Sequence, residues 1–431
     1  MNLPETFLRR MQKRLGEQFP AFLHAMEEPP CKGMRANPLK LTAAQLSQIL
    51  PVGDGVPWEK DGFYCDLEKV GSLPAHHAGL FYSQEPSAMC AAPLLAVKPF
   101  ERVLDLCAAP GGKTTQLASK MMGEGILVAN EVIPDRARIL SQNVERMGVK
   151  NCAVISASTA ELAKSLPAYF DKVLVDAPCS GEGMFRKDEN ARLEWSEENV
   201  SRCIARQRDI LDDAAGLLKA GGRMVYSTCT FSRGENEEQI EAFLSRHPEF
   251  VLLEQHRLMP QEVKGEGHFA ALLEKRGEAD EAHVKPFPVR REQAAEKAWR
   301  AFAADFFGKA PEGTLTTLPD GRMFLLPDGL PALPGRVLRA GVEVGEWNGK
   351  RFTPAHALAM ASRKGEVRRF VSLGRAEAQK YLRGEQLDLD AQTADGWCIV
   401  GFGEYPLGLG KCVGGAVKNH LPKGLRAARP L

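Results

Sequence analysis

Residues 103–115, VLDLCAAPGGKTT, decide the fold of this chain. The stretch begins as a short apolar run, turns at residues 108–112 and continues as the start of a helix. A buried parallel strand that runs into a glycine turn and a helix N-terminus forms a cofactor cradle. Glycines let backbone N–H groups approach a ligand, and the helix end favours negative charge. Asp105, near the carboxyl end of the strand, is expected to face the same crevice.

Two other interpretations of this turn must be weighed. Gly112-Lys113-Thr114 resembles the end of a phosphate-binding P-loop, but that motif needs a glycine where this chain has Cys107. The GxGxxG spacing of dinucleotide-binding turns is also absent. On this stretch alone, a site for a nucleoside-type cofactor and a plain strand–turn–helix both remain open.

Length and composition restrict the class of protein. A chain of 431 residues can form two or three domains, and 44% hydrophobic with 26% charged residues is ordinary for a globular protein. There is no apolar run of membrane-spanning length and no hydrophobic leader, so we expect a cytosolic protein without membrane contact. Ten cysteines without a CxxC pair predict no metal site and mostly buried thiols.

The chain divides into four regions. Residues 1–90 are expected to form a small α/β module, with a first helix whose basic side chains are interpreted as a solvated face, and a basic loop at 32–40. Residues 91–275 alternate apolar runs with amphipathic segments, the pattern of βαβ units in a mostly parallel sheet that binds ligands at the carboxyl ends of its strands. Residues 276–300 are interpreted as a linker.

The secondary structure expected in the 91–275 region follows from the same pattern. The expected strands are 102–106, 126–130, 153–156, 172–176 and 223–227. The expected helices are 112–122, 134–147, 159–165, 200–219 and 235–246. Residues 301–431 form a C-terminal region with basic clusters at 363–383 and 401–431, where nearby aromatic residues and glycines favour a surface for a phosphate backbone.

Two further stretches end in cysteine-containing turns: residues 173–185, VLVDAPCSGEGMF, and residues 225–231, VYSTCTF. Cys179 and Cys229 each follow an apolar run, so each is expected above the sheet on the cofactor side, although a buried structural cysteine is the usual alternative. A carboxylate does not lower the pKa of a thiol, so Asp176 is expected to bind hydrogen-bond donors of a substrate. Glu131, after the second strand, is placed where an acid could bind ribose hydroxyls.

With these turns in place, the chain resembles the RNA 5-methylcytosine methyltransferases of the Nol1/Nop2/Sun family, in the bacterial RsmB/RsmF branch with a PUA-like C-terminal domain. The resemblance covers nearly the whole chain. It rests on DLCAAPGGKT at 105–114, DAPCSG at 176–181, STCT at 227–230, RAN at 35–37, QEPS at 84–87 and the end of the chain from 396 to 426.

The resemblance implies a Rossmann-like class I methyltransferase core between a small N-terminal α/β module and a C-terminal α+β PUA-like RNA-binding region. It implies S-adenosylmethionine as methyl donor and a cytosine of ribosomal RNA, in the small subunit, as acceptor. The implied partner is ribosomal RNA or the small ribosomal subunit, and we expect a monomer. The implied cofactor-binding residues are Asp105, Cys107, Ala108, Ala109, Pro110, Gly111, Gly112, Lys113, Glu131, Arg136 and Asp176.

The roles of the catalytic residues also follow from the resemblance. Cys229 would attack C6 of the cytosine, Cys179 would assist the later elimination, and Asp176 would hold the N3/N4 edge of the base. The target base must leave any stack to reach these groups.

The chain departs from the family at two places. Residues 156–158, Ser-Ala-Ser, replace the acid that often meets the adenine amine, and His268 replaces an aromatic residue, for which it is interpreted as a packing substitute. The alternative functions are methylation of transfer RNA and a non-catalytic RNA-binding protein with a methyltransferase-like core. The presence of both cysteines favours the enzyme.

Overall fold

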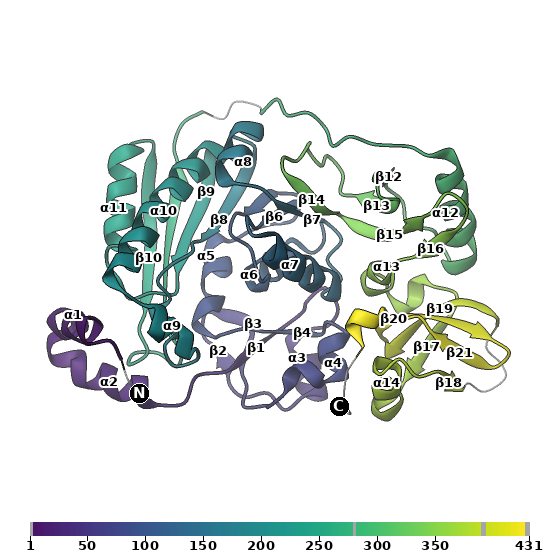
Figure 1. Ribbon diagram of the computed structural model, residues 1–431, viewed down its shortest axis with the longest axis horizontal. Helices are drawn as coiled ribbons and strands as arrows, with labels where there is room; N and C mark the ends of the chain where they lie inside the picture. Colours follow the sequence, from purple (N-terminus) through teal and green to yellow (C-terminus); the bar gives the residue numbers. More distant parts are fainter. Residues whose placement is uncertain (1–2, 279–281, 389–393, 427–431) are drawn as a thin grey trace.

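The structure is a computed structural model that describes residues 3–278, 282–388 and 394–426. An eight-stranded sheet lies at its centre, in the order β10-β11-β9-β8-β5-β6-β7-β14 (Figure 1). The five strands from β9 to β7 in this order run parallel, whereas β10, β11 and β14 are antiparallel to their neighbours. The expected mostly parallel sheet is confirmed.

The central sheet is built from apolar strands with helices on both faces, and its strands are buried except at the edges, where β10 is largely exposed. Besides β14 (Arg336–Ala340), its strands are β5 (Arg102–Asp105), β6 (Ile126–Asn130), β7 (Cys152–Ser156), β8 (Phe170–Asp176), β9 (Leu218–Thr228), β10 (Phe250–Leu258) and β11 (His268–Lys275). Its helices are α5 (Ala91–Leu95), α6 (Gly112–Met121), α7 (Pro134–Arg146), α8 (Thr159–Ser165), α9 (Glu189–Glu194), α10 (Glu197–Leu217) and α11 (Glu237–Arg246). All five expected strands and all five expected helices are present, with ends shifted by up to five residues.

Alternation of side chains along each strand produces the three layers. Val103 packs in the apolar cluster of α5, α6 and α7, whereas the next residue, Leu104, packs in the cluster of α8, α10 and α11. Successive side chains of a strand point to opposite faces, so a strand that is apolar throughout must be covered on both. The core is therefore an α/β/α sandwich.

The N-terminal residues form two separate pieces. One is an antiparallel sheet in the order β2-β3-β1-β4, built from β1 (Gly33–Ala36), β2 (Gly55–Val56), β3 (Glu59–Tyr64) and β4 (Phe81–Ser83) with the helices α3 (Ala43–Ile49) and α4 (Pro74–His77). The expected loop at 32–40 is wrong for Gly33–Ala36, which form the buried strand β1, whereas residues 37–40 belong to no helix or strand. Arg35 is 1% exposed and donates to Gln84 Oε1, Thr115 Oγ1 and the Gly112 carbonyl, which joins this sheet to α6.

The other piece is a helical hairpin, α1 (Glu5–Leu15) and α2 (Phe19–Glu27), which packs on the core beside α9 (Figure 1). Phe7 contacts the rings of Phe185 and Phe231, which come from two loops of the core. Arg10 pairs with the buried Glu182, and Arg14 donates to the Phe231 carbonyl. The interpretation of the basic residues of α1 as a solvated face is therefore wrong for Arg10 and Arg14.

The C-terminal region is joined to the core by a strand. Its elements are α12 (Gln293–Phe306), β12 (Thr314–Thr317), β13 (Arg322–Leu326), β14 (Arg336–Ala340), β15 (Val342–Trp347), β16 (Phe352–Pro354), α13 (His356–Ala361), β17 (Phe370–Leu373), α14 (Arg375–Leu382), β18 (Leu387–Asp388), β19 (Gly396–Phe402), β20 (Tyr405–Val413) and β21 (Ala416–Asn419). β14 pairs with β7 and extends the central sheet. The helix α12 begins inside the segment 276–300 that the sequence suggested as a linker.

A charged contact fixes the C-terminal region against α7. Glu145 of α7 accepts hydrogen bonds from Arg339 of β14 and, at 2.8 Å, from His356 Nδ1 of α13. Burial alone would raise the pKa of Glu145, but the hydrogen bond from His356 and the charge of Arg339 outweigh it and hold this pKa at about 2. Glu145 is therefore ionised at neutral pH and stabilises the contact between the two regions.

Candidate active site

The candidate site lies where the order of the parallel strands reverses. From β5 the chain proceeds outward to β6 and β7, and then returns to the other side of β5 with β8 and β9. Loops that leave β5 and β8 diverge at this point, which in open α/β sheets is the position of the ligand-binding crevice. The glycine turn follows β5 and Asp176 ends β8, so both border this crevice.

The glycine turn is held in one shape by its neighbours. The N–H of Ala108 donates to the Asn130 carbonyl at 2.8 Å, and Asn143 of α7 donates to the Pro110 carbonyl at 2.8 Å. Gly111 has φ +112°, a conformation that residues with a Cβ rarely adopt, and a Cβ at this position would lie 3.1 Å from Leu140. The turn therefore requires glycine at 111, and it leads directly into the N-terminus of α6.

Asp105 has an unsatisfied oxygen beside this turn. Its side chain is fully buried, and Oδ2 accepts from Thr114 Oγ1 at 2.6 Å. Within the described residues, Oδ1 has no hydrogen-bond partner. Burial raises the pKa of Asp105 to about 7, despite the Thr114 hydrogen bond, which acts to lower it. A buried polar atom without a partner is costly, so this oxygen fits a ligand that carries a hydrogen-bond donor.

Glu131 and Arg136 are brought to the same turn. Glu131 is 3% exposed and lies 3.2 Å from Arg136 Nη1, and it accepts from the Ile133 N–H at 3.0 Å. Arg136 Nη2 donates to the Ala109 carbonyl at 3.0 Å. The arginine thus connects the acid after β6 to the glycine turn after β5. Glu131 retains lone pairs that could accept from a diol.

Lys113 and Asp176 form an ion pair on the substrate side of the turn. Lys113 Nζ lies 2.8 Å from Asp176 Oδ2, and Ser227 Oγ donates to Oδ1 at 2.8 Å. Burial raises the pKa of Asp176, but the charge of Lys113 and the hydrogen bonds from Lys113 and Ser227 outweigh burial and hold this pKa below its usual range. Burial lowers the pKa of Lys113, but Asp176 more than compensates for this effect. Both groups are therefore charged. The sequence analysis expected Lys113 to bind the cofactor, but in the structure its ammonium contacts Asp176.

The two cysteines predicted to lie above the sheet are in contact. Cys179 Sγ and Cys229 Sγ are 3.4 Å apart, although fifty residues separate them along the chain. Both side chains are partly exposed, as is that of Cys107. The hydrogen bond with Cys229 and burial raise the pKa of Cys179 well above its ordinary range, and burial does the same for Cys107. Cys179 and Cys107 are therefore neutral thiols at pH 7.

Two residues that the sequence analysis did not single out hold the cysteine loops together. Glu235 is fully buried and accepts from the Ser180 N–H at 2.8 Å, from Ser180 Oγ at 2.6 Å and from Thr230 Oγ1 at 3.2 Å. Asn236 accepts from Thr228 Oγ1 at 2.6 Å and donates to the Thr230 carbonyl at 2.9 Å. In each loop, the residue that follows the cysteine, Ser180 or Thr230, is therefore held by hydrogen bonds to Glu235 or Asn236. The local signal for this role is an acid and an amide six and seven residues after Cys229.

Glu182 and Gly183 connect the same loops from the other side. Glu182 accepts from the Phe231 N–H at 3.0 Å, and the Gly183 N–H donates to the Cys229 carbonyl at 2.8 Å. A Cβ on Gly183 would lie 2.8 Å from the Cys229 carbonyl oxygen and 3.0 Å from that of Gly267. Only glycine permits this close approach of three backbone segments. Cys229 is thus fixed by contacts on both sides of its loop.

The two departures from the family also have defined positions. Ser158 caps α8, and the Ser156 hydroxyl donates to the Val132 carbonyl at 3.2 Å, so both serine hydroxyls donate within the chain. His268 begins β11 and is 3% exposed, with Nε2 at 3.9 Å from Asp176 Oδ1. It therefore lies beside the predicted substrate-binding acid.

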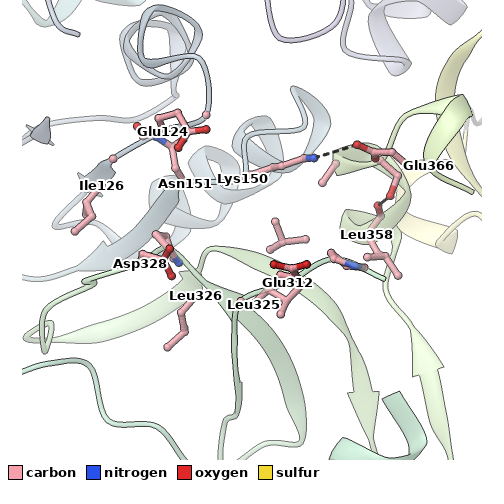
Figure 2. Close-up of a pocket in the computed structure, with 18 of the residues that line it drawn as sticks. Glu124, Ile126, Lys150, Asn151, Glu312, Leu325, Leu326, Asp328, Leu358 and Glu366 are labelled. Carbon is pink, nitrogen blue, oxygen red and sulfur yellow. Dashed lines mark hydrogen bonds and ion pairs between the residues drawn. The ribbon is translucent and has the colours of Figure 1, made fainter. Parts of the chain in front are cut away.

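A pocket of about 800 Å³ lies elsewhere, between the core and the C-terminal region (Figure 2). Ile126 and Asn151, which line it, lie at or just before the amino ends of β6 and β7. Lys150 and Glu366 form an ion pair across it at 3.8 Å. Because parallel sheets bind ligands at their carboxyl ends, this pocket is distinct from the candidate active site.

Comparison with known proteins places the chain in a family. Residues 92–292 match 16S rRNA methyltransferase RsmB/F, and residues 3–86 match the N-terminal domain of 16S rRNA methyltransferase RsmF. Residues 301–361 match the first C-terminal domain of RsmF rRNA methyltransferase, and residues 368–427 match the methyltransferase RsmF PUA domain.

Individual relatives match along almost their whole length. Ribosomal RNA small subunit methyltransferase F of Vibrio cholerae serotype O1 (strain M66-2) is 33% identical over 99% of this chain and 98% of its own, and that of Klebsiella pneumoniae (strain 342) is 34% identical over 98% and 96%. A methyltransferase homologue from Pyrococcus horikoshii is 30% identical, with a TM-score of 0.55 over 63% of this chain and 100% of its own.

The fold, with a glycine turn at the switch point of its parallel strands, is that of a class I S-adenosylmethionine-dependent methyltransferase. The chain belongs to the RsmB/F family of 16S rRNA methyltransferases. The family resemblance that the sequence motifs indicated is confirmed. The enzyme class, a methyltransferase, and the methyl donor, S-adenosylmethionine, are confirmed with it. Among the described helices, none is both long and apolar enough to span a membrane.

Proposed function

We propose that this enzyme transfers the methyl group of S-adenosylmethionine to C5 of a cytosine in small-subunit ribosomal RNA. The observation that carries the proposal is the contact of the Cys179 and Cys229 thiols at 3.4 Å, in loops that leave the same edge of the sheet as the charged pair of Lys113 and Asp176. Two thiols beside a carboxylate suit addition to a pyrimidine ring followed by elimination.

Cys229 is the nucleophile in this proposal. Cytosine C5 is a poor nucleophile, but addition of the Cys229 thiolate to C6 breaks the C5–C6 double bond and places its electron pair on C5 as an enamine. After C5 has gained the methyl group, loss of the C5 proton to a base returns the electron pair, and the C6–sulfur bond breaks. The Cys229 thiolate is then regenerated.

Cys179 and Asp176 support this sequence in different ways. Cys179, kept as a neutral thiol by its neighbour and by burial, can donate a hydrogen bond to the departing Cys229 sulfur during elimination and is not suited to attack. Asp176 would accept from the N4 amine and the protonated N3 of the base, and Lys113 keeps its carboxylate ionised. We assign Cys229 to attack, Cys179 to elimination and Asp176 to base binding.

The cofactor site follows from the same residues. When bound, S-adenosylmethionine supplies an electrophilic methyl group. The free Oδ1 of Asp105 would accept from the ammonium of the methionine part, and Glu131 would accept from the ribose hydroxyls. The backbone N–H groups of Ala109, Gly111 and Gly112 would bind the methionine carboxylate. Arg136 would hold Glu131 and the glycine turn in fixed positions, because it contacts both Glu131 and the Ala109 carbonyl.

The C-terminal region would bind RNA through its PUA domain. Lys411 of β20 lies opposite Lys418 of β21 and, on its other side, opposite Trp397 of β19. The ring of Trp397 lies 4.5 Å from that of His420. Like charges on directly opposed residues destabilise a sheet, so this arrangement suits a phosphate partner, with the aromatic rings available for stacking. We further propose that the enzyme acts as a monomer in the cytoplasm, where its RNA substrate is found.

Bisulfite sequencing of small-subunit ribosomal RNA tests the proposed function. RNA from a strain that lacks this gene should lose protection at one or more cytosines, and a plasmid copy should restore it. A copy with Cys229→Ser should not restore protection. If the pattern of protected cytosines is the same with and without the gene, the proposed substrate is wrong.

A further inference from the structure

His268 is a buried residue for which neither the packing nor the mechanism above provides a use. It is 3% exposed, and within the described part of the chain neither Nδ1 nor Nε2 has a hydrogen-bond partner. A phenyl ring would fill a similar space without unsatisfied polar atoms. Buried polar groups normally have partners, so an imidazole with two free nitrogens indicates a partner that is not part of the chain.

The backbone holds His268 beside the reacting groups. The last pair of β11 with β9 joins Phe269 to Thr228, so His268 and Cys229 each directly adjoin this pair along the chain. Gly267 has φ +105°, and a Cβ there would lie 2.4 Å from the Phe231 ring. The Gly267 N–H also donates to Ser87 Oγ at 3.2 Å. His268 therefore has little freedom to turn away from the site.

The imidazole and the Asp176 carboxylate are spaced for a shared donor. His268 Nε2 lies 3.9 Å from Asp176 Oδ1, which is too long for a direct hydrogen bond. A nitrogen placed about 2.9 Å from both atoms would see them at an angle of roughly 85°, within reach of the two N–H bonds of one amino group. Burial and the charge of Lys113 lower the pKa of His268 to about 3, so the ring is neutral and can offer a lone pair.

We propose that His268 is a substrate-binding residue that recognises the exocyclic N4 amine of the target cytosine. Asp176 accepts one N4 hydrogen together with N3, and His268 Nε2 accepts the second N4 hydrogen, while Nδ1 carries the ring proton. This inference rests on the proposed function and adds a specificity-determining contact to it. When the base has no amine at C4, the lone pair of His268 Nε2 and the Asp176 carboxylate face each other without a donor between them, so such a base should be bound less well.

The test measures the coupling between His268 and the amine. Two RNA fragments carry the methylated site, one with cytidine and one with a pyrimidin-2-one ribonucleoside, which lacks the amine. The rate of adduct formation with Cys229 is measured under single-turnover conditions for wild type, His268→Phe and His268→Gln. Intrinsic differences in base reactivity cancel when the cytidine-to-pyrimidinone rate ratio is compared between proteins.

The ratio should fall about tenfold in His268→Phe, the worth of one hydrogen bond, and should recover in His268→Gln, whose amide oxygen can accept at the place of Nε2. S-adenosylmethionine affinity and the melting temperature should be unchanged. An unchanged ratio in His268→Phe would make His268 a packing residue. If cofactor affinity falls instead, the donor is the ammonium of the cofactor, and the proposal is wrong.

A further variant, His268→Leu, also removes the hydrogen-bond acceptor and covers the case in which His268→Phe does not fold. It should lower the cytidine-to-pyrimidinone rate ratio about as much as His268→Phe. Failure of the proposed function has a different signature. If wild-type protein forms no Cys229 adduct with either RNA, the covalent mechanism is wrong, whatever the variants do. If wild type forms the adduct and all variants share its ratio, only the role of His268 is wrong.

Discussion

The ionisation of Asp105 should control how tightly the enzyme binds S-adenosylmethionine. In the free protein, burial raises the pKa of this carboxyl to about 7, and only Oδ2 is satisfied, by Thr114. An ammonium at the free Oδ1 needs the ionised form. Binding should therefore strengthen as the pH rises through 7, because below that value a proton must first be removed from the carboxyl.

The size of the effect follows from the pKa. A carboxyl with a pKa of about 7 is about one-tenth ionised at pH 6 and about nine-tenths ionised at pH 8. The Kd of S-adenosylmethionine should consequently fall about tenfold over this interval, or about 1.4 kcal/mol. At pH 7, binding should release about half a proton.

Calorimetry at pH 6, 7 and 8, in buffers of different ionisation enthalpy, measures both quantities. Asp105→Asn is the matched control, since it keeps the hydrogen bond from Thr114 and any titration of the ligand itself but removes the carboxyl. The variant should bind S-adenosylmethionine weakly. The change in its Kd between pH 6 and pH 8 should be about tenfold smaller than the change for wild type. An identical pH dependence in the two proteins would refute the assignment of Asp105 to the ammonium.

Three further predictions concern other parts of the molecule. Glu145→Gln should lower the free energy of unfolding by about 3 kcal/mol at pH 7, because Arg339 and His356 lose their buried anion. Since the pKa of Glu145 is depressed to about 2, the difference from wild type in urea titrations should shrink as the pH falls from about 4.5 towards 2, and a constant difference would contradict the ion pair. Lys411→Glu with Lys418→Glu should flatten the salt dependence of RNA affinity, measured by fluorescence anisotropy, by about 0.7 in the log–log slope per lost phosphate contact, and an unchanged slope would make this surface merely solvated. Glu235→Gln should reduce the single-turnover rate of methyl transfer at least tenfold with unchanged cofactor affinity, because it weakens the hydrogen bonds that hold the two cysteine loops. Equal rates in the variant and in wild type would show that these loops do not depend on Glu235.

Local features of this chain could be predicted well from sequence. The glycine turn after β5 is specified by neighbouring residues, because an apolar run, a proline and two glycines determine both the strand end and the start of α6. The positions of Cys179 and Cys229 above the sheet follow from the strands before them in the same way. Each of these inferences needs only the residues of one stretch.

Features that depend on distant partners could not be predicted. Arg35 lies in a stretch that looks like a basic loop, but Gln84 and Thr115 satisfy it inside a buried sheet. The extension of the central sheet by β14 needs a pairing with β7 across nearly two hundred residues. The thiol contact and the bonds from Glu235 similarly join loops about fifty residues apart, and neither loop indicates the other.

The measurement that tests the central claim most directly is denaturing electrophoresis of the enzyme after reaction with its RNA and S-adenosylmethionine. Cys179→Ala should attack and methylate but release its product slowly, so a protein–RNA adduct should accumulate and survive denaturation. Cys229→Ala should bind both ligands yet form neither adduct nor product. The reverse pattern would exchange the roles of the two thiols, and full activity in both variants would contradict a covalent mechanism altogether.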